Sequence, residues 1–300
     1  MSRRRVAFGA LGLLALLLLS ALAPAPVGSL PRRALARGWR SAERAWLIAT
    51  GRLVDVGGYR LRVDCYGQGD MTVVLEAGLC QTRATWGRVV GVIASFARVC
   101  AYDRAGLGES DRAPGPRTPR RVVDDLERVL VATGTKAPYV LVGHSFGGLA
   151  VRLYAARHPE RVRGLILVDA SHEEQYARLA ELMEPQDRAA FLAHEGGGNC
   201  EALDLLAAAK ELREAGSLPA VPLVVLTARP RWAVAGCPDD AVRTELQAQL
   251  ARLSPRARHV LAERSGHFIQ LDRPDVVTAA VREVAGAAAV TERAASGGPR

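Results

Sequence analysis

The chain has 300 residues, which is enough for one large domain or two small ones. Hydrophobic residues make up 49% of it, an ordinary share for a globular enzyme and enough for a large core. The net charge of +9 comes almost wholly from arginines scattered among acidic residues, with no long basic run beyond Arg3 to Arg5, so the sequence argues against nucleic-acid binding.

The N-terminus has the pattern of a targeting or anchoring segment. MSRRR is followed by VAFGALGLLALLLLSALA, residues 6–23, which carries no charge. A run of about eighteen apolar residues is near the lower limit for a membrane-spanning helix and also suits a signal-peptide core. Residues 1–29 are therefore either a signal peptide or a membrane anchor, and an anchor would associate with a membrane through residues 6–23. Both alternatives predict an extracytoplasmic domain after a linker at residues 30–50.

From residue 51 onward, strand patterns alternate with helix patterns. Residues 51–67 predict a hairpin, because two alternating runs are joined by Gly57 and Gly58. Short apolar runs predict strands at residues 72–75, 97–102, 139–142, 165–168, 221–227 and 259–262. Helical periodicity predicts helices at residues 119–132, 149–156, 242–253 and 275–288.

This alternation predicts an α/β fold with a mostly parallel central sheet and helices on both faces. Residues 171–218 interrupt the alternation, because they lose the strand pattern and become helical and charged. We expect them to form a cap insertion over one end of the sheet. The predicted domain covers residues 51–290, and residues 291–300 are expected to be a flexible tail.

The stretch GHSFGG places Ser145 between the predicted strand at 139–142 and the helix that follows. A turn this sharp forces strained dihedrals on the serine, and Gly143 and Gly147 must lack side chains to avoid collision. This pattern is a nucleophile elbow, which presents the serine oxygen at the top of a sheet. A serine nucleophile needs a base that takes its proton, and the base needs an orienting acid.

Of the six histidines, His267 is the predicted base. It lies in ERSGHFIQLDRP, on the loop between the last strand and the last helix. In a parallel sheet of this kind, loops after the strands gather at the carboxyl edge, where the elbow also lies. His144, although next to Ser145, is expected to point away from it.

Three motifs together resemble those of α/β-hydrolase fold enzymes, over about residues 51–290. They are GHSFGG at the elbow, YDRAGLGESD at 102–111 and SGH at 265–267. The resemblance implies the order serine, acid, histidine, and implies no metal and no organic cofactor. The cysteines also lack metal-ligand spacing.

The acid has two candidate positions in this family. Its usual place is after the seventh strand, where this chain has Asp239 and Asp240 only late in the segment. Some members take it from the end of the sixth strand, which matches Asp169 in LILVDASH. Asp169 is favoured, and the two later aspartates remain alternatives.

The oxyanion hole of this family is made of two backbone N–H groups. One belongs to the residue after the nucleophile, which is Phe146 here. By alignment the second belongs to Leu79, where Glu76-Ala77-Gly78 replaces the usual His-Gly. Arg104 is expected to shape the site without reacting.

These expectations predict a serine hydrolase that cleaves an ester, amide or thioester bond of a small acyl substrate through an acyl-enzyme intermediate. Two alternatives remain open. One is an acyltransferase or C–C bond hydrolase that uses the same triad, and the other is a non-catalytic binding protein of the same fold. The oligomeric state has no signal in the sequence.

Two disulfides are conceivable among the five cysteines. In the fold that the chain resembles, the strands that carry Cys65 and Cys100 are neighbours, so these two residues could pair. Cys200 and Cys237 could join the cap insertion to the loop after the seventh strand, and this second bridge is slightly favoured. Cys80 would then be the unpaired thiol.

Overall fold

The computed structural model describes residues 51–229 and 238–296. The predicted signal or anchor segment, the linker at residues 30–50 and Cys237 lie outside these ranges. None of the helices within the two described ranges combines the length and the apolar character that crossing a bilayer requires.

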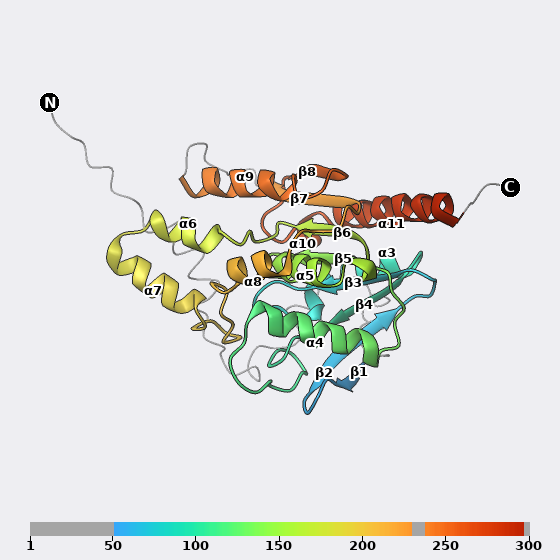
Figure 1. Ribbon diagram of the computed structural model, residues 1–300, viewed down its shortest axis with the longest axis horizontal. Coiled ribbons are helices and arrows are strands. Elements are labelled where there is room, and N and C mark those ends of the chain that lie inside the picture. Colours follow the sequence, from blue (N-terminus) through green and yellow to red (C-terminus); the bar gives the residue numbers. More distant parts are fainter. Residues whose placement is uncertain (1–50, 230–237, 297–300) are drawn as a thin grey trace. The chain divides into compact units, whose positions relative to one another are not determined.

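An eight-stranded sheet forms the centre of the domain (Figure 1), in the order β1-β2-β4-β3-β5-β6-β7-β8. The hairpin β1–β2 is antiparallel, and β2 is antiparallel to β4, whereas all pairs from β4 to β8 are parallel. The mostly parallel sheet is therefore confirmed. The strands are β1 Arg52–Asp55, β2 Arg60–Tyr66, β3 Thr72–Glu76, β4 Arg98–Tyr102, β5 Tyr139–His144, β6 Val162–Val168, β7 Leu223–Arg229 and β8 Ala257–Glu263.

Helices cover both faces of the sheet, as predicted (Figure 1). One core cluster joins α4, α5 and α8 to one face, and a second joins α3 and α11 to the other. Successive side chains of a strand point to opposite faces, so Leu141 of β5 lies in the first cluster and Val142 in the second. The helices are α3 Val90–Ala94, α4 Pro119–Ala132, α5 Phe146–Arg157, α6 Gln175–Glu181, α7 Pro185–Glu195, α8 Ala208–Ala215, α9 Pro238–Leu250, α10 Ile269–Asp272 and α11 Pro274–Ser296.

The helix α4 shows how local sequence determines an element. Pro119 occupies its first turn, where a missing N–H costs nothing. Its buried residues follow a helical repeat and include Val122, Leu126 and Val129. The predicted bounds of this helix are confirmed. The helix α11 is longer than predicted, so residues 291–296 of the expected flexible tail are helical.

The hairpin and its disulfide follow the prediction. Gly57 and Gly58 both have positive φ, at 104° and 99°, which the tight turn requires. Cys65 of β2 lies directly opposite Cys100 of β4 in the sheet register. Their Cα atoms are 4.1 Å apart and the two residues form a disulfide. The predicted Cys65–Cys100 bridge is confirmed.

The insertion at residues 171–218 is helical, but only part of it forms a separate cap. The helices α6 and α7 pack on one another. In contrast, α8 packs against α5, and its Leu212 joins the main core together with Leu203 and Leu205. The second half of the insertion therefore belongs to the body of the domain, because its apolar residues are buried there.

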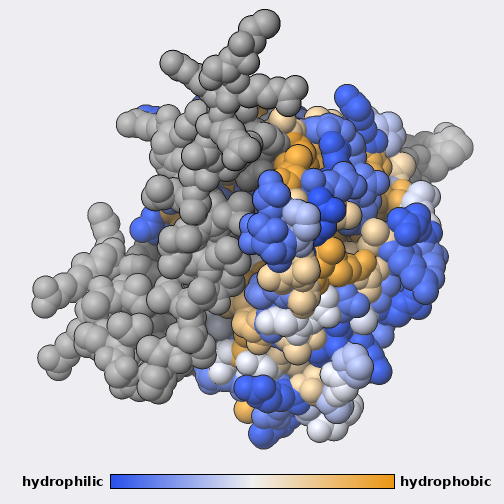
Figure 2. All heavy atoms as spheres, turned by 90° about the vertical axis from the view of Figure 1, so that its left-hand side faces the viewer, coloured by the Kyte–Doolittle hydropathy of each residue, from blue (hydrophilic) through white to orange (hydrophobic). Residues whose placement is uncertain are grey.

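Figure 2 shows the domain from the side on which α6 and α7 lie. Apolar and charged side chains are mixed on the coloured part of this surface. The insertion also carries two large exposed apolar side chains, Leu182 at the end of α6 and Leu206 before α8.

Candidate active site

Ser145 occupies the sharp turn between β5 and α5, with φ 53° and ψ −124°. This left-handed conformation is costly for a residue with a side chain, as the elbow pattern predicts. A Cβ on Gly143 would lie 2.3 Å from the Gly147 oxygen, and one on Gly147 would lie 2.3 Å from the Glu76 oxygen. Neither position can accept a side chain, so the glycine requirement is confirmed. Gly148 has the same requirement against Ala170, which sequence reasoning missed.

Backbone hydrogen bonds join the elbow to the loop after β6. The Ser145 N–H donates to the Val168 oxygen at 3.1 Å, and the Ser171 N–H donates to the Ser145 oxygen at 2.9 Å. Asp169 lies between these contacts and has a positive φ of 43°. These hydrogen bonds therefore hold the strained turns at Ser145 and Asp169 side by side at the ends of neighbouring strands.

Asp169 and His267 are brought together at the carboxyl edge of the sheet. The His267 Nδ1 lies 2.7 Å from the Asp169 Oδ2. The aspartate side chain is only 2% exposed, whereas the histidine side chain is 44% exposed. The structure thus places the predicted serine, acid and base on the loops after β5, β6 and β8, as the parallel topology requires.

The Asp169 carboxylate also has partners that the sequence did not reveal. Arg243 of α9 donates through Nη1 to both carboxylate oxygens, at 2.8 and 2.9 Å. The Ala228 N–H, at the end of β7, donates to Oδ1 at 2.9 Å. Arg243 also donates to the Ala228 oxygen at 2.7 Å. No sequence pattern pointed to Arg243, because its contact is made only when α9 packs beside β7.

These contacts decide the ionisation of the acid. Burial by itself raises the pKa of Asp169, but the hydrogen bond with His267 and the charge of Arg243 lower it. The net effect is a pKa below the usual value for an aspartate. The carboxylate therefore stays ionised at neutral pH.

The alternative acids Asp239 and Asp240 lie in the first turn of α9. Their side chains are outside the described part of the structure. What α9 contributes to the described site is the cation of Arg243.

His144 lies beneath the site and does not contact solvent. Its Nε2 lies 2.9 Å from the His267 backbone oxygen, and its Nδ1 lies 3.2 Å from the Gln81 Oε1. The two histidine rings are 4.6 Å apart. Burial, and secondarily the charge of His267, lower the pKa of His144 to about 3. It is thus a neutral bridge that holds the His267 loop against the elbow.

The expected oxyanion residues lie on either side of the elbow. Phe146 is fully buried at the start of α5, and Leu79 is partly buried after β3. Within residues 51–229 and 238–296, no acceptor binds the N–H of Phe146 or Leu79. The Arg104 guanidinium lies 5.2 Å from the centre of the Phe146 ring. Arg104 therefore contributes to the shape of this region, as expected.

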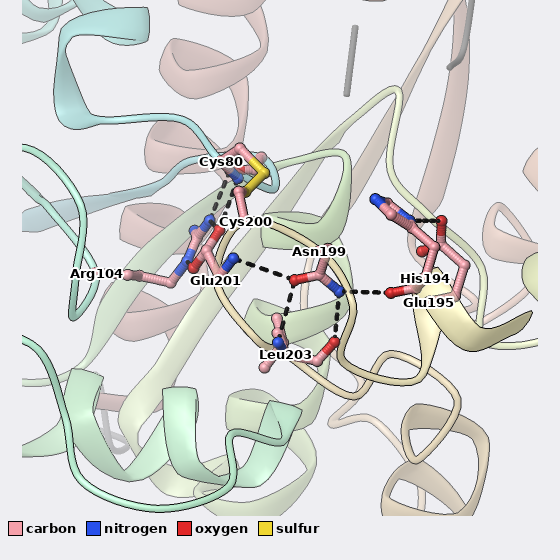
Figure 3. The surroundings of a disulfide bond; sticks show 9 residues. Cys80, Arg104, His194, Glu195, Asn199, Cys200, Glu201 and Leu203 are labelled. Atoms are coloured by element: carbon pink, nitrogen blue, oxygen red, sulfur yellow. Dashed lines mark hydrogen bonds and ion pairs between the residues drawn. A yellow bond between two sulfur atoms is a disulfide. The ribbon is translucent and has the colours of Figure 1, made fainter. Parts of the chain in front are cut away.

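The second disulfide corrects the sequence prediction. Cys200 is bonded to Cys80, not to Cys237, and the Cα atoms of the pair are 5.9 Å apart (Figure 3). The prediction was wrong because the loop after α7 folds onto the loop after β3, where the buried Arg104 binds Glu201. Cys80, Cys200 and Glu201 are near enough to share a metal ion. Their sulfurs are bonded to one another and the carboxylate is paired, so these groups are already engaged.

A family model of the alpha/beta hydrolase fold matches residues 72–193. The chain therefore has the α/β-hydrolase fold. A solved structure, that of a thermophilic esterase from Thermogutta terrifontis, has a TM-score of 0.54 at 24% identity, and the match covers 78% of this chain and 97% of that one. At this identity the likeness establishes the fold.

The curated relatives that this chain matches differ in length. A probable transporter of Hormonema carpetanum is 35% identical over 142 residues, which are 45% of this chain and 20% of that protein. An uncharacterized protein of Bacillus subtilis is 27% identical over 220 residues, with 73% of this chain and 85% of that protein covered. The match thus spans about a fifth of the first relative and most of the second.

The burial of His144 leads to a prediction about stability. Unfolding releases a histidine whose ordinary pKa is 6.5, whereas the folded residue has a pKa of about 3. The unfolded state therefore binds more protons between these values, and the free energy of unfolding falls as pH drops below about 6.5. From about pH 7.5 to pH 5, His144 should account for a loss of about 2 kcal/mol.

The measurement is urea unfolding of the wild type and His144→Gln at both pH values. The variant should lose about 2 kcal/mol less than the wild type over this interval. Other buried histidines are common to both proteins, so their effects cancel in the comparison. An equal loss in the two proteins would contradict a neutral His144.

Proposed function

We propose that this protein is a serine hydrolase that cleaves a carboxylic ester of a small acyl substrate through an acyl-enzyme intermediate. Ser145 is the nucleophile, His267 is the general base and Asp169 is the orienting acid. The observation that carries the proposal is the 2.7 Å contact between Asp169 and His267 at the same sheet edge as the strained Ser145. The match to the alpha/beta hydrolase fold and the likeness to a solved esterase support the same chemistry.

The contact at Nδ1 determines how His267 can act. With Nδ1–H donated to Asp169, the Nε2 lone pair is free to take the Ser145 proton as the oxygen attacks the ester carbonyl. The negative charge that develops on the carbonyl oxygen needs two N–H donors. We assign these to Leu79 and Phe146, whose N–H groups have no acceptor within the described residues.

In the remaining steps, His267 passes on the proton that it took from Ser145. Protonated His267 gives its proton to the alcohol that leaves, which produces the acyl-enzyme. A water molecule then attacks the acyl carbonyl while His267 takes one of its protons. Collapse of this second tetrahedral intermediate releases the acid and returns the proton to Ser145. The overall reaction is the conversion of an ester and water into an acid and an alcohol.

We further propose that the domain works outside the cytoplasm. Two disulfides, Cys65–Cys100 and Cys80–Cys200, are present. Such bonds persist in oxidising compartments and are rare in the cytosol. This agrees with the N-terminal signal or anchor pattern, and it leaves the choice between the two open.

The catalytic assignment predicts that Ser145→Ala and His267→Ala each abolish turnover of short p-nitrophenyl esters. We expect losses of about 10⁴-fold or more, since triad members act as a unit. Fluorophosphonate labelling should be lost in Ser145→Ala. Circular dichroism would confirm that both variants are folded, and release rates in water against alcohols would separate hydrolase from acyltransferase activity. Near-wild-type turnover in either variant would refute the assignment.

The acid assignment makes a prediction of rank order. Asp169→Asn should lower kcat by about 10⁴-fold, because the amide no longer holds His267 in the required tautomer. Asp239→Asn and Asp240→Asn are the matched substitutions and should each change kcat less than about threefold. The measurement is kcat on one p-nitrophenyl ester for all three variants. The reverse order would place the acid after β7.

Arg243 leads to a prediction about the pH profile. Burial raises the pKa of Asp169, whereas the hydrogen bond with His267 and the charge of Arg243 lower it. Arg243→Gln removes that charge, so the pKa of Asp169 should rise. The acid limb of kcat/KM should therefore move to higher pH, because the acid must be ionised to orient His267.

The control is Arg243→Lys. It keeps the positive charge but cannot bind the Asp169 carboxylate and the Ala228 oxygen at the same time through two nitrogens. Its kcat should fall while the acid limb remains near that of the wild type. If Arg243→Gln and the wild type have superimposable pH profiles, the cation does not act on the proposed acid–base pair.

A further inference from the structure

The Cys80–Cys200 disulfide joins the cap insertion to the proposed oxyanion hole (Figure 3). We call residues 76–80 the oxyanion loop and residues 196–206 the cap loop. Cys80 directly follows Leu79, the residue whose N–H is assigned to the oxyanion hole. Both cysteines are exposed, so the bond is accessible to a reductant.

Glu201, the residue after Cys200, reaches the same loop through hydrogen bonds. Its Oε1 accepts from the Cys80 N–H at 2.7 Å and from the Arg104 Nη2 at 2.6 Å. Its Oε2 accepts from the Arg104 Nε at 2.8 Å. The Glu201 and Arg104 side chains are each 2% exposed, so these charges are buried against one another. A buried pair of this kind is costly to break on one side.

Arg104 in turn holds the carbonyl groups of the oxyanion loop. Its Nη1 donates to the Ala77 oxygen and its Nη2 to the Gly78 oxygen, both at 2.6 Å. The Gly78 oxygen and the Leu79 N–H belong to one planar trans peptide, in which they point in opposite directions. Binding the Gly78 oxygen therefore sets the direction of the Leu79 N–H. Glu201 sets the next peptide in the same way through the Cys80 N–H.

Asn199 makes the cap loop rigid enough for this purpose. Its side-chain oxygen accepts from the N–H groups of Glu201 and Leu203, at 3.2 and 3.1 Å. Its side-chain nitrogen donates to the Leu203 oxygen at 2.7 Å and to the His194 oxygen at 3.3 Å. Leu203 is fully buried, so the loop is fixed to the core. Figure 3 shows these contacts, which run from Asn199 to Glu201 beside the disulfide and to Leu203 and His194.

We propose that Glu201 and the Cys80–Cys200 disulfide are positioning elements for the oxyanion hole, so that the cap insertion determines the rate of the chemical step. The proposal rests on the proposed serine hydrolase function. A dithiol reductant would supply two electrons and two protons to the disulfide, leaving two thiols and a cyclic disulfide of the reductant. The freed loop would then lose the alignment of the Leu79 N–H.

The test compares Cys80→Ser/Cys200→Ser and Glu201→Gln with the wild type on a p-nitrophenyl ester. Removing one oxyanion donor costs about 10²- to 10³-fold in kcat, so a loosened donor should cost about 10- to 100-fold. KM should change less than about twofold, because the effect appears in the transition state. Fluorophosphonate labelling of Ser145 should slow in parallel.

Two matched controls isolate the effect. Cys65→Ser/Cys100→Ser removes the other disulfide, which joins β2 to β4 and does not involve the cap insertion, and should leave kcat within about twofold. Glu214→Gln makes the same change as Glu201→Gln in the exposed pair that Glu214 forms with Arg120. It should also leave kcat unchanged.

Reduction of the folded protein keeps the proposal testable if a variant fails to fold. In the Cys65→Ser/Cys100→Ser background, a dithiol should lower kcat about 10- to 100-fold, and reoxidation should restore it. An unchanged kcat after complete reduction would overturn the proposal. A higher KM at unchanged kcat would also overturn it, because the cap would then act only on substrate binding. Activity that survives Ser145→Ala would instead refute the proposed function itself.

Discussion

The buried carboxylate of Asp169 is the group on which the geometry of this site depends. It comes from the end of β6, accepts a backbone N–H from the end of β7, binds Arg243 of α9 and contacts His267 after β8. A carboxylate at 2% exposure is stable only if each of these partners is in place. The Asp169 carboxylate therefore connects the ends of β6, β7 and β8.

Polar groups of two kinds join the loops near Ser145. His144 is neutral because it is buried, and it joins the Gln81 loop to the His267 loop through its two ring nitrogens. The buried Arg104 guanidinium keeps its positive charge because the carboxylates of Glu76 and Glu201 form ion pairs with it. A neutral bridge and an ionic bridge thus both bind the loop after β3. Both connect loops that are distant in sequence, and both restrict how the loops can move.

The cap insertion has a double role in this arrangement. Its helices α6 and α7 lie outside the sheet layers, whereas Leu203, Leu205 and α8 belong to the main core. The loop between these two parts carries Cys200 and Glu201 to the oxyanion loop. The insertion, which interrupts the strand and helix alternation in the sequence, is therefore attached both to the oxyanion loop and to the main core.

Much of the fold could be predicted because it is encoded locally. Spacing within a few residues predicts the buried face of α4, the apolar strands and the glycines around Ser145. The placement of His267 followed from topology, since parallel strands end at the same edge. The pairing of Cys65 with Cys100 followed from the strand neighbours that the family resemblance implied.

The sequence by itself thus determined the α/β class, the elbow and the order of serine, aspartate and histidine along the chain. Only the tertiary structure decided the partners of Asp169, the bridge made by His144 and the pairing of Cys200 with Cys80. The physical reason is that these contacts join loops and helices whose packing has no periodic signal. Arg243 and Glu201 are single charged residues in charged stretches of the sequence, and only the contacts that they make in the folded chain give them their importance.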